Sequence, residues 1–258
     1  MTLTVAGEPL LAFLLASVRI VAWLAIVPPF STRSVPAMAK VVLSLGLAFA
    51  VAPSLARSTM PTGTFELAAT ALTQAAVGLG MGFVTMLLFA AIGAAGSLVD
   101  VFGGFAVAQI FDPLSMNMNT VFGKFHQLLA TMLLFASGGH LLVIGGLLKT
   151  FHFLPIGETP DVDGPGLLTT AFSMFFVTAV QIALPLIAVL FIADVGLALL
   201  TKVAPQMQAI NVMFPAKIGL TLVLLGLSFP VLPEALDRLV DLALEAMATI
   251  AGAGAGAG

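Results

Sequence analysis

The sequence "AATALTQAAVGLGMGFVTMLLFAAIGAAGSLV", residues 68–99, contains no aspartate, glutamate, lysine or arginine. A helix of about 20 apolar residues crosses the hydrocarbon core of a bilayer, which is about 30 Å thick. This stretch is longer than one crossing requires. It therefore predicts a membrane helix that tilts, kinks or extends past the bilayer.

The composition of the rest of the chain agrees with a membrane location. Hydrophobic residues make up 60% of the 258 residues and charged residues only 8%. A soluble domain carries about 25% charged residues, so this much apolar surface cannot be hidden in one water-facing globule. We expect an all-α polytopic membrane protein. The net charge of −3 and the scattered basic residues indicate no nucleic-acid partner.

Six apolar stretches qualify as long hydrophobic helices. They are Leu10–Pro28, Ala37–Leu55, Ala68–Val99, Phe125–Leu148, Leu167–Leu190 and Ile218–Leu232. A shorter amphipathic helix is expected at Glu234–Ile250, lying at a surface or against a partner rather than crossing the membrane. Its acidic face carries Asp237, Asp241 and Glu245, and its apolar face carries Leu236, Leu239, Val240, Ala243 and Met247. We interpret residues 1–250 as a single all-helical domain and 251–258, "AGAGAGAG", as a low-complexity tail or linker.

Small residues follow one face of the third apolar stretch. The face comprises Gly78, Gly82, Thr85, Phe89, Gly93, Gly96 and Asp100, and Gly78 and Gly82 form a GxxxG pair. Such a face favours close packing of helix backbones. The alternative is that it lets the helix bend or lines a narrow passage. Gly103 and Gly104 are expected to end this helix and to act as a hinge.

Ionisable side chains within apolar stretches, or close to their ends, are candidates for function because they are costly at membrane depth. Arg19 lies within the first stretch, and Asp100 and Asp194 lie close to the ends of the third and fifth. We expect Arg19 to pair with an aspartate, within the bundle or across subunits, and a proton path stays open as an alternative.

No set of residues indicates a catalytic or metal centre. Cysteine is absent, and His126, His140 and His152 lie at spacings that do not indicate a metal site. No nucleotide-binding or protease motif occurs. We expect no enzymatic activity and no cofactor.

A polar island interrupts the apolar chain at "AQIFDPLSMNMNTVFGKF", residues 108–125. Its composition permits an ordinary surface loop. However, methionine suits irregular or changing surfaces, and non-helical backbone at membrane depth is tolerated where it is buried in protein or lines an aqueous cavity. The island is therefore a candidate for a deformable constriction.

The order and spacing of several stretches resemble the FliR/SctT family of type III secretion export-gate membrane proteins. These stretches are residues 19–48, 78–83, 94–113, 138–157 and 183–218. The resemblance implies bent helical hairpins, and assembly with FliP and FliQ into a gate in the bacterial inner membrane at the flagellar basal body, part of it on the periplasmic side. It further implies cooperation with FlhB and FlhA, unfolded flagellar proteins as substrates, and no enzymatic activity.

The resemblance also implies a role for the polar island. The segment from Ala106 to about Val121 would act as a plug that closes the gate. Its candidate residues are Val107, Ile110, Phe111, Asp112, Pro113, Met116, Asn117, Met118 and Asn119. Relatives carry aromatic residues where this sequence has Val107 and Ile110. Three alternatives stay open: a small-solute transporter or channel, the equivalent subunit of a virulence secretion system, and a purely structural membrane subunit.

Overall fold

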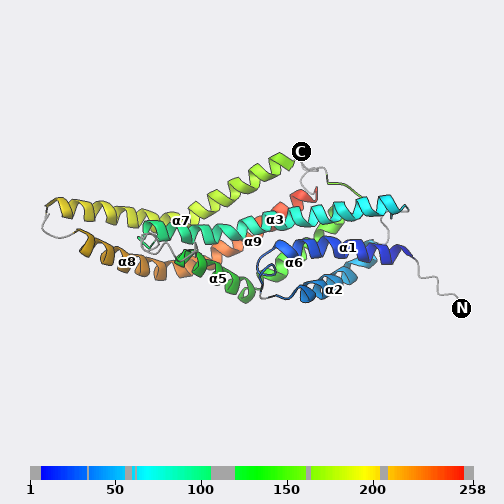
Figure 1. Cartoon of the computed structure of the whole chain (residues 1–258), viewed down its shortest axis with the longest axis horizontal. Helices are drawn as coiled ribbons and strands as arrows, with labels where there is room; N and C mark the ends of the chain where they lie inside the picture. The colour runs from blue at the N-terminus through cyan, green and yellow to red at the C-terminus, as the bar shows by residue number, and fades with distance from the viewer. Residues whose placement is uncertain are drawn as a thin grey trace, which may run out of the picture. The chain divides into compact units, whose positions relative to one another are not determined.

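The computed structural model describes residues 7–33, 35–55, 60–61, 63–105, 120–160, 164–203 and 209–252. These residues form eight α-helices and one short 3₁₀-helix (Figure 1). In chain order the elements are α1 (Gly7–Ile26), α2 (Ala37–Leu55), α3 (Thr64–Phe102), α5 (Val121–Ala136), α6 (Gly139–Phe153), α7 (Gly164–Val203), α8 (Ala209–Ser228), η1 (Phe229–Val231) and α9 (Leu232–Ile250). The all-α prediction is confirmed for the part of the chain that the structure describes.

The described part of the structure contains fewer helices that could cross a membrane than the six apolar stretches expected from the sequence. Among the described residues four qualify, namely α1, α3, α7 and the run Pro215–Ile250, and a broken pair of helices makes a fifth. The helix α2 begins and ends where the sequence analysis expects, but its apolar part, Ala37–Pro53, is shorter than a span. The expected stretch Phe125–Leu148 is the broken pair, α5 and α6.

The break between α5 and α6 has a local cause. Gly138 adopts a left-handed conformation, with φ of 76°, directly before α6 begins. A side chain would strain this conformation, whereas glycine adopts it readily. Hydropathy alone treats the two helices as one apolar stretch because it does not register backbone direction.

The C-terminal part of the chain also differs from the expectation. In place of a short span and a separate surface helix, α8, η1 and α9 follow one another without a gap. The apolar face of α9 is buried as expected, with Leu239, Ala243 and Met247 fully buried, and its acidic residues Asp237 and Asp241 are exposed.

Contacts divide the chain into two compact units, and the single domain expected from the sequence stays a prediction. The first unit comprises Met1–Leu87, Gly138–Ala171 and Leu239–Gly258. In it α1 packs against α2, and α2 against α6. Its core contains fully buried side chains, among them Trp23, Met81 and Leu147. Close approach of α3 to α1 occurs at Gly78, where an added Cβ would meet the Arg19 carbonyl oxygen.

The second unit comprises Leu88–Ser137 and Phe172–Arg238. Its core cluster joins α3, α5, α7 and α8 through Ala95, Val99, Phe122, Ala183, Leu186 and Leu225. The helices α7 and α8 lie side by side in this unit (Figure 1) and are joined by an ion pair between Asp194 and Lys217.

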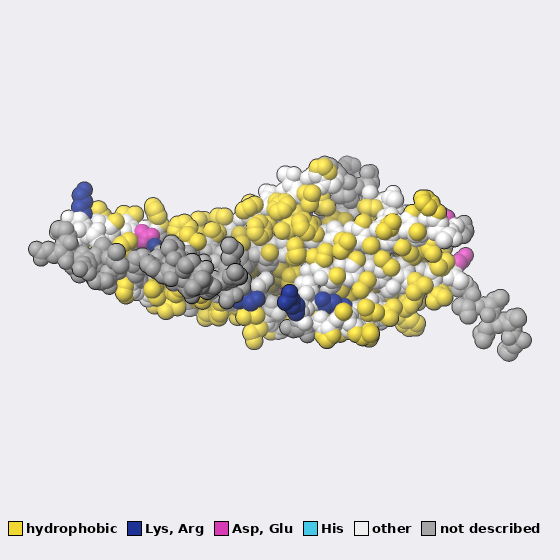
Figure 2. Space-filling view, in the orientation of Figure 1, with side chains coloured by type: hydrophobic (Ala, Val, Ile, Leu, Met, Phe, Trp, Pro, Cys, Tyr) yellow, Lys and Arg dark blue, Asp and Glu magenta, His cyan; other side chains and the backbone are white. Residues whose placement is uncertain are grey.

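Large apolar side chains are exposed over much of the described surface (Figure 2). On α7 they extend from Phe172 to Val203, which is 83% exposed. Contiguous exposed apolar surface marks contact with lipid or with another protein. The chain therefore has a surface suited to a membrane or to neighbouring subunits.

Candidate functional site

The last turn of α3 is where the expected hinge begins. The helix ends at Phe102, as the sequence predicts, and the Gly103 amide donates to the Val99 carbonyl at 2.7 Å. Gly104 has φ of 84°, a conformation that favours glycine. The hinge role of these two glycines stays a prediction.

Helix α5 begins at Val121 and is capped by a side chain from α3. One carboxylate oxygen of Asp100, Oδ2, accepts the backbone N–H groups of Phe122 at 2.9 Å and Gly123 at 3.2 Å. Asp100 is only 1% exposed. Thr120, which precedes the helix, makes no capping bond of its own. Its hydroxyl instead lies 2.7 Å from the hydroxyl of Ser97.

The two flanks of the polar island therefore lie against each other. The ring of Phe105 packs edge-on against that of Phe122 with centroids 4.7 Å apart. The backbones of α3 and α5 approach closely because Gly96 and Gly123 carry no side chain. A Cβ on Gly96 would lie 2.7 Å from the carbonyl carbon of Phe122. We call this group of contacts the α3–α5 clamp; it comprises Gly96, Ser97, Asp100, Phe105, Thr120, Phe122 and Gly123.

The plug residues themselves lie outside the described residues. This applies to Val107, Ile110, Phe111, Asp112, Pro113, Met116, Asn117, Met118 and Asn119. Their proposed role stays a prediction, and the structure places only the helices on either side of them.

Arg19 has partners other than the expected aspartate. Its Nε donates to Oε1 of Gln74 at 2.7 Å, and its Nη2 donates to the Leu154 carbonyl at 2.9 Å. The guanidinium also lies over the Phe151 ring, 4.2 Å from the centroid. Arg19 and Gln74 are fully buried. Among the described residues, the expected pair within the bundle is therefore wrong, because neutral acceptors and a ring face surround the charge. A pair with an aspartate of another subunit stays a prediction.

Asp194 has a basic partner instead. Its Oδ2 lies 2.7 Å from Nζ of Lys217, joining α7 to α8. Side-chain exposure is 28% for Asp194 and 13% for Lys217. A partly buried pair of opposite charges neutralises both side chains within an otherwise apolar hairpin.

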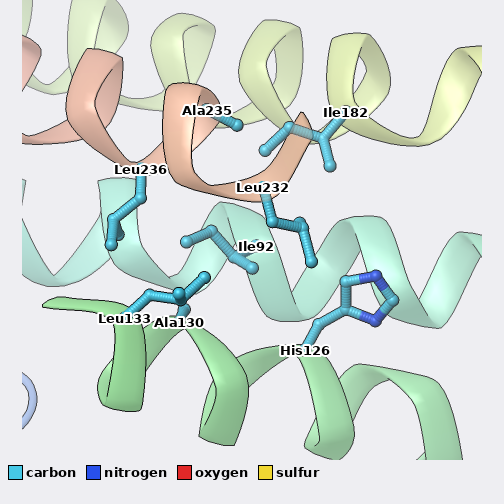
Figure 3. A pocket seen from close by; sticks show the side chains of 8 residues that line it. All are labelled: Ile92, His126, Ala130, Leu133, Ile182, Leu232, Ala235 and Leu236. Atoms are coloured by element: carbon cyan, nitrogen blue, oxygen red, sulfur yellow. The ribbon is translucent and has the colours of Figure 1, made fainter. Parts of the chain in front are cut away.

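A small hollow in the second unit is lined by aliphatic side chains and His126 (Figure 3). Nδ1 of His126 lies 2.8 Å from the Phe122 carbonyl oxygen, which can only accept, so Nδ1 carries the hydrogen. The remaining lining residues are Ile92, Ala130, Leu133, Ile182, Leu232, Ala235 and Leu236. In the described residues no three histidine, aspartate or glutamate side chains are grouped as metal ligands would be.

These features define an all-α integral membrane protein. Its helices are long, apolar and exposed over much of their surface, and buried hydrogen bonds join some of them. The model of the family "Bacterial export proteins, family 1" matches residues 10–243, and the chain belongs to this family.

Curated relatives are similar along most of the chain. The flagellar biosynthetic protein FliR of Escherichia coli K12 is 32% identical over 90% of this chain and 89% of its own length. The FliR of Bacillus subtilis 168 is 25% identical over 92% of this chain and 93% of its own. The secretion system apparatus protein SsaT of Salmonella typhimurium LT2 is 28% identical over 60% of each chain. The resemblance to the FliR/SctT family is confirmed.

Several polar residues that contact Arg19 or belong to the α3–α5 clamp were not predicted from the sequence. Gln74, Ser97 and Thr120 are uncharged and occur in stretches where hydroxyl and amide side chains are unremarkable. Lys217 could have been predicted, because it directly precedes one apolar stretch and Asp194 follows the end of the stretch before it. Ionisable side chains near membrane depth need partners.

Proposed function

We propose that this chain is a subunit of the flagellar type III protein export gate in the bacterial inner membrane, at the flagellar basal body. The observation that carries the proposal is the family match over residues 10–243. The flagellar relatives favour the flagellar system, because they align over about nine tenths of the chain and the SsaT relative over 60%. In this role the chain forms part of a passage for unfolded proteins and performs no catalysis.

The proposed partners are FliP and FliQ within the gate, and FlhB and FlhA beside it. The length of α7 supports neighbouring subunits. Its 40 residues correspond to about 60 Å at the usual helical rise, whereas the hydrocarbon core of a bilayer is about 30 Å thick. Exposed apolar side chains continue from Phe172 to Val203. Lipid around a single upright crossing would cover about half of this length, and other protein subunits would cover the rest.

The segment from Ala106 to Val121 would close the idle gate. Apolar Val107, Ile110, Phe111, Met116 and Met118 would exclude ions, and Asn117 and Asn119 would supply uncharged hydrogen-bonding groups. The contact between Phe105 and Phe122 supports this role, because it brings the two ends of the segment together.

Native mass spectrometry tests the assignment to the gate. The chain is co-expressed with its genomic neighbours and extracted in detergent. We expect a large hetero-complex that contains one copy of this chain. A stable monomer or homo-oligomer that excludes those neighbours would contradict the proposal and favour a small-solute transporter.

Removal of the polar island tests the plug. Residues 106–119 are replaced by a short glycine linker that joins Phe105 to Thr120, two residues before Phe122, whose ring packs against that of Phe105. Because the apolar seal is lost, we expect a several-fold rise in ion flux through the reconstituted complex and increased unregulated secretion in cells. As a control, point substitution of Thr131 by valine on α5 should leave both unchanged. A deletion variant as tight as the native complex would rule out the plug.

A further inference from the structure

We propose that Asp100 is a positioning residue of the gate, which clamps the start of α5 to the end of α3 and so fixes both attachment points of the polar island. This inference rests on the proposed function and adds to it a residue outside the plug.

The capping geometry is the first support. The second or the third amide group of a helix is usually satisfied by the side chain of the residue that precedes the helix. In α5 these are the amides of Phe122 and Gly123, and Asp100 satisfies both from the preceding helix. A local cap would stabilise α5 alone. A cap supplied from α3 also ties the two helices together across the island.

The second support is that the other clamp contacts act at the same place. The hydroxyls of Ser97 and Thr120 meet at 2.7 Å, one turn before Asp100 on α3 and one residue before α5. A Cβ on Gly123 would lie 2.6 Å from the Ser97 oxygen. Only a glycine allows the start of α5 to come close enough for the Asp100 carboxylate to reach both amides.

Burial decides how much the clamp depends on Asp100. The residue is 1% exposed, and Phe122 is 5% exposed. A buried N–H that loses its acceptor has no ready access to water, and this raises its free energy relative to a paired state. Loss of the carboxylate therefore favours a rearrangement in which the start of α5 separates from α3 and finds water. The attachment point of the island at Thr120 would move with it.

The test compares ion flux through complexes reconstituted in liposomes. Asp100→Ala should raise the flux several-fold above that of the native complex, while native mass spectrometry shows the same subunit composition. Thr131→Val is the matched control, because it removes a side-chain hydrogen bond within α5, to the Gln127 carbonyl, away from the clamp. It should leave the flux unchanged.

A disulfide at the clamp separates a positioning role from a folding role. The chain has no cysteine of its own. The substitutions Ser97→Cys and Thr120→Cys therefore introduce its only two cysteines, at sites whose hydroxyl oxygens are 2.7 Å apart. This pair is combined with Asp100→Ala, and the complex is assembled and reconstituted in the oxidised form. The flux should equal that of the native complex and should rise several-fold when the disulfide is reduced.

The outcomes are distinct. If reduction leaves the flux at the native level while deletion of residues 106–119 raises it, Asp100 is not a positioning residue and the plug stands. If the deletion variant is as tight as the native complex, the plug and the clamp both fail. A rise on reduction that is larger with Asp100→Ala than with the cysteine pair alone, at unchanged subunit composition, supports the role of Asp100 in the clamp.

Discussion

Replacement of Gly78 by alanine should lower the melting temperature of the protein by about 5–10 °C, for a loss of roughly 2–3 kcal/mol in a chain of this size. A Cβ at this position would overlap the Arg19 carbonyl oxygen and lie 3.1 Å from Cβ of Ala22. Both belong to the neighbouring helix α1, so the two helices must move apart. The loss exceeds the gain of about 1 kcal/mol that alanine brings to a helix interior.

Gly80 provides the matched control on the same helix. An added Cβ there meets no atom within 4 Å, so Gly80→Ala should leave the melting temperature unchanged or raise it slightly. The single tryptophan, Trp23, is buried on α1 and reports unfolding by its fluorescence in detergent solution. Equal melting temperatures for the two variants would show that α1 and α3 are not in backbone contact at Gly78.

The sequence was sufficient to predict helices where physical requirements are local. A long charge-free stretch such as residues 68–99 has few stable alternatives to a helix in an apolar environment, and it lies within α3. The glycine face was also informative. Its close-packing interpretation is confirmed at Gly78 against α1 and at Gly96 against α5.

The number of membrane-crossing runs was harder to predict. Hydropathy measures how readily a segment leaves water, and it does not report whether the backbone continues in one direction. The left-handed Gly138 divides one apolar stretch into two helices. The short η1 turn instead connects two segments that the sequence analysis had separated.

The polar partners could not be predicted fully because they are distant in sequence or belong to the backbone. Arg19 lies 55 residues from Gln74, and its second acceptor is the carbonyl of Leu154. Every residue has a carbonyl group, so residue type carries no signal for such a bond. Asp100 was identified as a candidate, but its capping of α5 depends on the close approach at Gly96 and Gly123.

Replacement of Arg19 by alanine should lower the free energy of unfolding by about 3–5 kcal/mol, from about 1–2 kcal/mol for buried acceptors that lose their donor and about 2–3 kcal/mol for the loss of a large buried side chain. The substitution leaves Gln74 and the Leu154 carbonyl without their donor in a fully buried site, and it also leaves a cavity. Thermal unfolding followed by tryptophan fluorescence measures the change.

The double substitution Arg19→Met with Gln74→Leu isolates the cause of that loss. It replaces both partners by apolar side chains that fill the space, so only the Leu154 carbonyl loses a bond. Exchange of both partners for apolar groups of similar shape is often nearly neutral, and we expect the double variant to lie within about 1–2 kcal/mol of the native protein. A double variant as unstable as Arg19→Ala would contradict this account. The positive charge itself would then stabilise the fold, and an anionic partner for Arg19 would have to be sought in a neighbouring subunit.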